Sequence, residues 1–229
     1  MKTLVTQAII LTRTDYGEAD RILTLLTPHY GKLRLLAKGV RRVKSKLAGG
    51  IELFSVSDIT FIRGRGEIGT LVSTRLITHY GTIVTNLDRT MTGYDLIKQL
   101  HTLTEDEAES AYFDLLQHTF EALNQPEVSL PMLHFWFEAQ LLQLEGQAPN
   151  LQRDTHGQPL DATVTYSFSF ERMALTPDTQ GRLGVDEVKF LRLAFGRQSA
   201  RSLQQIRDAD TLLAAVAPLV HMLRLRMPG

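Results

Sequence analysis

The sequence contains no cysteine. This absence excludes structural disulfides, zinc sites built on thiolates and a cysteine nucleophile. The catalytic motifs G-x-S-x-G and H-E-x-x-H and the P-loop are also missing, and the seven histidines lack the spacing of metal ligands. We therefore expect a protein that is not an enzyme and that holds no metal or other cofactor.

Long hydrophobic runs are absent as well. No stretch approaches the ~18 apolar residues of a membrane span. The N-terminus has only a short apolar run and no small-residue cleavage site, so we expect no signal peptide and a cytoplasmic protein. A chain of 229 residues with 43% hydrophobic and 22% charged residues is typical of one large or two small globular domains.

The formal net charge is zero, but the charges are unevenly distributed. Residues 1–80 carry 13 Lys or Arg against 6 Asp or Glu, whereas residues 81–229 carry 12 against 19. This division predicts two modules with different partners, of which the first binds an anion. We place the boundary near Gly81 and predict domains at 1–80 and 81–229.

The most informative stretch runs from Tyr30 to Phe54. Its first basic residues alternate with leucine and alanine, so an extended strand would direct cations to one face and apolar groups into a core. The cations, with no acidic residue between the first and the last, are Lys32, Arg34, Lys38, Arg41, Arg42, Lys44 and Lys46. A polyanion relieves the repulsion among them and releases its own counterions, so we expect a nucleic-acid backbone as the ligand.

The first 80 residues have the pattern of a small β-barrel. Besides the basic strand, the predicted strands are 6–11, 21–26, 53–63 and 70–74. Phe54 and Val56 differ in parity from Ile59 and Phe61, which predicts a bulge near residues 57–58. About five strands within this length indicate an OB-fold barrel, whose exposed face binds single strands.

Residues 64–69 match the fingerprint G-x-G-x-x-G of dinucleotide sites. Such a site needs a following helix to receive the pyrophosphate, whereas the β-branched run 70–74 favours a strand. We therefore interpret the glycines as a hairpin turn, and a nucleotide-dependent enzyme is the most distant alternative. Arg63 and Arg65 then add charge to the same barrel.

Two groups of residues in this region have competing interpretations. The carboxylates of Asp15, Glu18 and Asp20 are more simply turn residues and salt-bridge partners than metal ligands. The aromatic residues Tyr30, Phe54 and Phe61 are candidates for base stacking, although core positions are the simpler interpretation.

Beyond Gly81 the apolar period changes from two to 3.6, which predicts helices. The first has an apolar stripe at Leu87, Met91, Tyr94 and Ile97. A capping box at 104–107 opens the second. Further helices are predicted at 132–144, 186–195 and 209–225. The helix 132–144 is apolar nearly all round, so we expect it to be buried, with Trp136 in the core.

Residues 146–180 are rich in turn-forming residues and contain one credible strand, 163–170. We interpret them as an irregular insertion with a short hairpin. The arginines after this insertion give the C-terminal part a basic character, which either extends a DNA path, binds an acidic peptide or is simply solvated.

The N-terminal sequence contains the motifs YGEADR, T-x-x-x-GK, AKG-x-RR-x-KS and RGRGE-x-GTL, in this order. In these motifs, their order and their spacing, it resembles the RecO family of recombination mediators. Residues 146–151, GQAPNL, are similar to the family's G-x-x-PNL. Many members continue with a four-cysteine zinc ribbon, but the corresponding residues 153–175 contain no cysteine, so we expect no zinc here.

The resemblance implies an α+β protein with an N-terminal OB-fold barrel and an α-helical domain whose insertion lacks the zinc ribbon. It implies a mediator at the nucleoid that binds single- and double-stranded DNA and anneals complementary strands. It further implies association with RecR and single-stranded-DNA-binding protein so that RecA can load. The DNA-contact role is carried over to the seven cations of the basic stretch, and then to Arg63 and Arg65.

Two alternatives remain open. An RNA-binding OB module would have the same charge pattern and fold. A protein-interaction scaffold would carry the same basic segment as a merely solvated surface.

Overall fold

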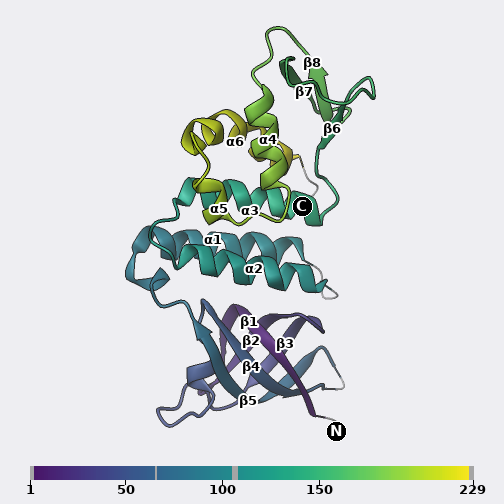
Figure 1. Cartoon of the computed structure of the whole chain (residues 1–229). Coiled ribbons are helices and arrows are strands. Elements are labelled where there is room, and N and C mark those ends of the chain that lie inside the picture. Colours follow the sequence, from purple (N-terminus) through teal and green to yellow (C-terminus); the bar gives the residue numbers. More distant parts are fainter. Residues whose placement is uncertain (1–2, 65, 105–107, 227–229) are drawn as a thin grey trace. The chain divides into compact units, whose positions relative to one another are not determined.

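The computed structural model describes residues 3–64, 66–104 and 108–226, which form two compact units that divide between Gln125 and Pro126. The first unit combines a β-barrel with helices α1 and α2, and the second combines the later helices with a small sheet (Figure 1). This is the predicted α+β architecture, with the barrel first. The strands give way to helices near residue 81, as the sequence indicates, but the compact units divide only after α2. The assignment of 1–80 and 81–229 as functional domains stays a prediction.

Five strands close into the barrel in the order β1-β2-β3-β5-β4. They are β1 (Thr3–Tyr16), β2 (Asp20–Thr27), β3 (Gly31–Ala37), β4 (Ser55–Ile62) and β5 (Ile68–His79). Only β3 and β5 pair in parallel, over the three pairs that join Arg34–Leu36 to Ile68–Thr70. The other pairs are antiparallel, so β4 and β5 form the hairpin that the glycine-rich turn predicts. The barrel has the predicted OB-type topology.

The apolar residues of the basic strand enter the barrel as predicted. Leu35 and Ala37 lie in the core with Phe61, and Leu33 packs against it. Their neighbours Lys32 and Arg34 have the opposite parity on β3 and therefore project outward.

The outer surface of the barrel is partly covered by α1 (Leu87–Leu103) and α2 (Ser110–Leu123), which contact β1 and β2 (Figure 1). The ring of Phe54 packs edge-on against Tyr94 of α1 and Phe120 of α2, at centroid distances of 5.4 and 5.5 Å. The change of side along residues 53–63 therefore arises because Phe54 is buried beneath the helices, outside the barrel.

The predicted bulge is found beside its expected place. The β4–β5 ladder is irregular between Val56 and Ser57, which pair with Thr78 and Leu76. Because Ile77 lies between those two partners, the extra residue belongs to β5 and not to β4.

The predicted apolar stripe of α1 is wrong for three of its four residues. Leu87, Met91 and Tyr94 are 75%, 53% and 44% exposed, and only Ile97 is buried. The buried residues of the helix are Arg89, Thr92, Gly93, Leu96, Ile97 and Leu100. Gly93 permits close approach of the Phe54 ring, and the guanidinium of Arg89 donates to the carbonyl of Leu123 at 2.8 Å. Close packing and backbone capping therefore select polar and small residues on this face.

The predicted helix start at Thr104 is also wrong. The backbone N–H of Thr104 donates to the carbonyl of Leu100 at 3.0 Å, so this residue ends α1. Residues 105–107 of the predicted capping box lie outside the described residues, and α2 begins at Ser110.

The second unit is built around the buried helix α3 (Leu130–Leu144), which contacts α4 (Val185–Ala194), α5 (Ala200–Gln204) and α6 (Ala209–Leu225). The predictions for α3, α4 and α6 are confirmed, whereas the short α5 was not predicted. Trp136 is 5% exposed and its Nε1–H donates to the carbonyl of Gln198 at 2.7 Å, which confirms it as a core residue.

The insertion contains a three-stranded sheet of order β6-β8-β7. Its strands are β6 (Asn150–Asp154), β7 (Tyr166–Ser169) and β8 (Ala174–Pro177). The antiparallel pair of β7 and β8 is the predicted hairpin, and β6 was not predicted.

Among the described residues, no group of three or more His, Asp or Glu is arranged to hold a metal ion. In the same part of the chain, no helix has both the length and the apolar character that crossing a membrane requires.

Candidate nucleic-acid interface

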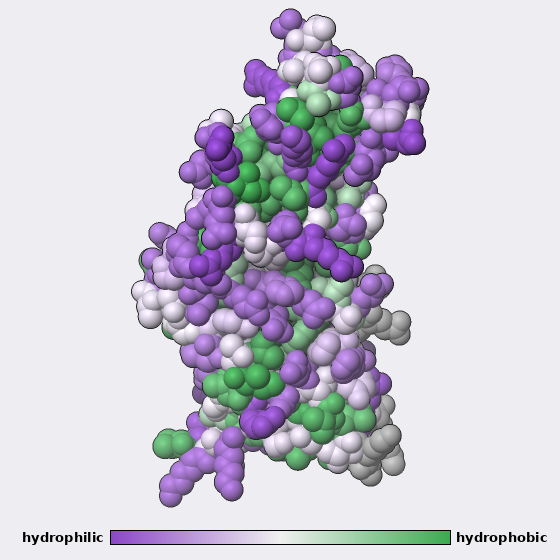
Figure 2. Space-filling model, viewed as in Figure 1, coloured by the Kyte–Doolittle hydropathy of each residue, from purple (hydrophilic) through white to green (hydrophobic). Residues whose placement is uncertain are grey.

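The most prominent cationic feature is the segment 38–47 between β3 and β4, here called the basic loop. Its exposed cations are Lys38, Arg41, Arg42, Lys44 and Lys46. The loop extends from the side of the barrel away from α1 and α2 (Figure 1). Hydrophilic side chains reach outward in the same region of the molecular surface (Figure 2). The described acidic residues of α1 and α2 therefore do not mask these cations.

The start of the basic loop is fixed to the β1–β2 turn. Val40 is 4% exposed and belongs to the core of the barrel. The backbone N–H of Gly39 donates to a carboxylate oxygen of Asp20 at 2.7 Å, and that of Arg41 donates to the carbonyl of Ala19 at 2.9 Å. These contacts hold the first residues of the loop in one position.

The end of the basic loop is fixed to β5. Leu47 packs against the barrel core, and its carbonyl accepts a hydrogen bond from the hydroxyl of Thr74 at 3.2 Å. Between the two anchors, backbone N–H groups of Arg42 and Ser45 donate to the carbonyls of Gly39 and Arg42 at 3.1 and 3.0 Å. The exposed cations thus stand on a turn that is supported at both ends.

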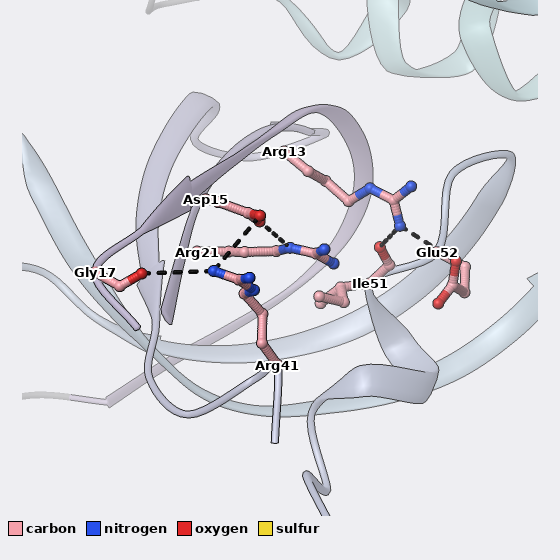
Figure 3. Close-up of polar contacts among 7 residues, drawn as sticks. All are labelled: Arg13, Asp15, Gly17, Arg21, Arg41, Ile51 and Glu52. Atoms are coloured by element: carbon pink, nitrogen blue, oxygen red, sulfur yellow. Dashed lines mark hydrogen bonds and ion pairs between the residues drawn. The ribbon is translucent and has the colours of Figure 1, made fainter. Parts of the chain in front are cut away.

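Arg41 of the basic loop lies together with Arg13 of β1 and Arg21 of β2, and we call these three residues the arginine cluster (Figure 3). The carboxylate of Asp15 accepts from Nε of Arg21 at 2.8 Å and lies 3.5 Å from the guanidinium of Arg41. Arg13 pairs with Glu52 at 3.2 Å. Two carboxylates partly neutralise three guanidiniums, so the cluster keeps a positive excess next to the other cations of the basic loop. The interpretation of Asp15 as a salt-bridge partner is confirmed.

Sequence reasoning did not include Arg13 and Arg21 in the candidate site. Arg21 pairs with Asp15 across the β1–β2 hairpin, and Arg41 reaches the same carboxylate from a distant part of the sequence. The hairpin register was the signal that could have placed Arg21 here, because opposite charges on facing residues stabilise antiparallel strands.

The arginines around Asp15 make its ionisation part of the stability of the loop. The hydrogen bond from Arg21, together with the charges of Arg41, Arg21 and Arg13, lowers the pKa of Asp15 below its usual 3.8. A lowered pKa stabilises the folded state above the usual value, and this contribution is lost as the pH falls through the folded-state value. We expect Asp15→Asn to lower the urea midpoint at neutral pH, and the difference from the parent to vanish in acid below the folded-state pKa. Urea denaturation of both proteins from neutral to acid pH measures the difference in midpoint. A difference that did not change with pH would contradict the assignment.

Lys32 is placed differently from the other predicted cations. Its ammonium donates to the carbonyls of Thr104 and His101, the latter at 3.0 Å, and lies 3.4 Å from Nδ1 of His101. These groups form the C-terminal end of α1, where a cation compensates the partial negative charge of the helix. Burial of His101 and the charge of Lys32 both lower the pKa of this histidine. The position of Lys32 favours a capping role over its predicted contact with DNA.

This placement predicts a stability effect. Lys32→Met should lower the free energy of unfolding by about 1 kcal/mol, because the end of α1 loses a charged hydrogen-bond donor. Urea denaturation measures the change, with Lys98→Met, an exposed lysine on the same helix, as the matched control. If the variant kept full stability but bound DNA with a shallower salt dependence, Lys32 would be a phosphate contact after all.

Lys32, Arg34 and Arg63 line a groove of about 400 Å³ that is formed by β3 and the β4–β5 turn. Arg34 pairs with Glu67 at 3.6 Å, and the guanidinium of Arg63 lies 5.5 Å from the centre of the Tyr30 ring. Arg65 lies outside the described residues. The predicted cations that the structure describes are therefore divided between the basic loop and this groove, and Lys32 of the groove also caps the end of α1.

The aromatic candidates for base stacking are mostly core residues. Phe54 and Phe61 are 1% and 0% exposed. Tyr30 is half-buried and packs edge-on against Phe61 at 5.5 Å. The core interpretation is confirmed for both phenylalanines.

Comparison with known proteins agrees with this architecture. The family model described as "Recombination protein O N terminal" matches residues 1–80, and the one described as "Recombination protein O C terminal" matches residues 99–224. The chain belongs to the RecO family. The N-terminal RecO match covers the barrel and the basic loop, and the C-terminal match covers most of the helical part, where the sequence motifs alone were sparse.

Several relatives carry the name "DNA repair protein RecO", and three of them serve as examples. One from Dehalococcoides mccartyi strain 195 is 35% identical over 194 residues, covering 82% of this chain and 76% of the relative. One from strain CBDB1 of the same species is 38% identical over 166 residues, covering 70% and 64%. One from Roseiflexus sp. strain RS-1 is 33% identical over 178 residues, covering 77% and 62%. The chain thus spans less than two thirds of the length of the last two relatives.

Proposed function

We propose that this RecO-family chain acts in DNA repair as a recombination mediator without catalytic activity of its own. It binds single- and double-stranded DNA, anneals complementary strands and, with RecR, helps to load RecA on DNA coated by single-stranded-DNA-binding protein. This role places the protein in the cytoplasm, at the nucleoid. The observation that carries the proposal is the anchored basic loop with its exposed cations, next to the arginine cluster.

The proposed contacts with DNA are Lys38, Arg41, Arg42, Lys44 and Lys46 of the basic loop, joined by Arg13 and Arg21. Arg34 and Arg63 are secondary contacts at the groove. Arg21 and Arg41 already bind Asp15, which holds their guanidiniums in place before a phosphate arrives. Such preorganisation reduces the conformational entropy that binding must remove.

Annealing follows from the same electrostatics. Two DNA strands repel each other through their phosphates, and a cationic surface that neutralises both backbones lowers this repulsion while the bases remain free to pair. No catalytic side chain is required.

If about five phosphates are neutralised, the logarithm of the affinity for single strands should fall against the logarithm of salt concentration with a slope of roughly −3.5.

The decisive experiment measures annealing of complementary oligonucleotides that are coated with single-stranded-DNA-binding protein, with and without this chain. We expect acceleration by the chain, and an earlier start of RecA-dependent strand exchange when RecR is also present. Coated strands that anneal at the same rate with and without the chain would refute the annealing role. Competition between DNA and RNA of the same sequence tests the RNA-binding alternative, because a clear preference for RNA would exclude the repair role.

A further inference from the structure

The tip of the basic loop carries an aliphatic side chain that is exposed to solvent and is not part of the barrel core. Val43 is fully exposed, with a relative accessibility of 104%, and it stands between Arg42 and Lys44. Figure 2 shows a small hydrophobic group beside the hydrophilic side chains in this region. The other valine of the loop, Val40, is 4% exposed in the barrel core. The same short segment therefore buries one valine and presents the other to solvent.

A single exposed apolar residue is ordinary on a protein surface. Val43 differs in its setting, because the residues on either side of it in the sequence are cationic and the turn that carries it is fixed at both ends by Val40 and Leu47. A β-branched side chain also has little rotamer freedom to lose on contact. The position is thus apolar, lies on a turn that is fixed at both ends, and is flanked by groups that attract phosphate.

We propose that Val43 is a base-contacting wedge, and this inference rests on the proposed binding of DNA. Phosphates held by Arg42 and Lys44 bring the intervening nucleotides over the tip of the loop, where the valine side chain packs against the apolar face of a base. Apolar side chains inserted between bases partly unstack them. Single strands give up less stacking and no base pairing on this contact, so Val43 favours single strands over duplex and keeps bases available to a complementary strand.

Val43→Thr tests the proposal, because it keeps the branched shape and all charges but replaces a methyl group with a hydroxyl. The matched control is Val5→Thr, at a 64% exposed position on β1. The probe is a single strand that contains a fluorescent aminopurine, whose emission rises when it is unstacked. We expect Val43→Thr to weaken binding about fourfold, to reduce the rise in emission and to leave the salt slope unchanged. The control should behave as the parent protein.

A second variant, Val43→Lys, separates apolar contact from electrostatics. It should steepen the salt slope by about 0.7 while losing the rise in emission, since one phosphate contact is gained and the wedge is lost. Parent-like emission and affinity in Val43→Thr would overturn the wedge while leaving the proposed DNA binding intact. If the parent protein itself bound single strands without salt dependence, the proposed function and the wedge would fall together.

Discussion

Replacing Arg42, Lys44 and Lys46 by glutamate will lower the affinity for single-stranded DNA about a hundredfold at about 0.1 M salt. Each lost phosphate contact removes about 0.7 from the slope of log affinity against log salt, so three contacts remove about 2. Extrapolated from about 1 M to about 0.1 M salt, this change in slope corresponds to two decades in affinity. Fluorescence anisotropy at several salt concentrations measures both quantities.

The same substitutions should leave the fold intact, because the three side chains are exposed and the loop is held by other groups. The matched control reverses three exposed cations outside the barrel, Lys98, Lys189 and Arg197. It introduces the same change in net charge, so any general effect of charge on DNA binding appears in both proteins. Unchanged DNA binding by the folded loop variant would favour the protein-interaction scaffold.

Gly93→Ala will lower the free energy of unfolding by about 2 kcal/mol. A Cβ at this position would lie 2.9 Å from Cζ of Phe54, and still closer to Cε1. The Phe54 ring is enclosed by Tyr94 and Phe120, so it has little room to move. Alanine favours a helix by about 1 kcal/mol over glycine, and the net loss remains because the steric cost is larger.

Gly49→Ala is the matched control for this prediction. A Cβ on Gly49 meets no atom within 4 Å, and the residue lies in the short 3₁₀ helix η1 (Ala48–Gly50). Chemical denaturation of the two variants and the parent gives the comparison. A Gly93→Ala protein as stable as the parent would show that α1 can move away from the barrel without loss.

The barrel was predictable because its strands alternate apolar and polar residues between clear turn signals. What the sequence could not show is that α1 and α2 would cover part of its outer surface. Ile9, Ile10 and Leu11 are all buried, which an open strand would not require. In α1 the apolar period pointed to Leu87, Met91 and Tyr94, whereas the helix packs through Gly93 and Leu96. Periodicity identifies a helix, but it does not show which side of the helix must carry small residues so that a neighbouring element can pack against it.

The candidate site was predictable to the extent that it is local in sequence. The cations of the basic loop follow one another in the chain, so charge density alone revealed them. Arg13 and Arg21 join them only through the β1–β2 pairing and the salt bridge of Arg41 to Asp15. Lys32 has the same alternation as Arg34, and only the position of the end of α1 shows that it has a different role.

The parallel junction of β3 and β5 has a consequence for the motions of the barrel. Three residue pairs close it, whereas every other strand pair of the described barrel has seven or more. Local opening should therefore begin at this seam, where parting a short ladder turns the closed barrel into a curved open sheet and leaves the antiparallel hairpins intact. Leu35 and Gly69, which line the groove near Arg34, belong to this seam. Such a fluctuation would widen the groove and leave the anchors of the basic loop undisturbed.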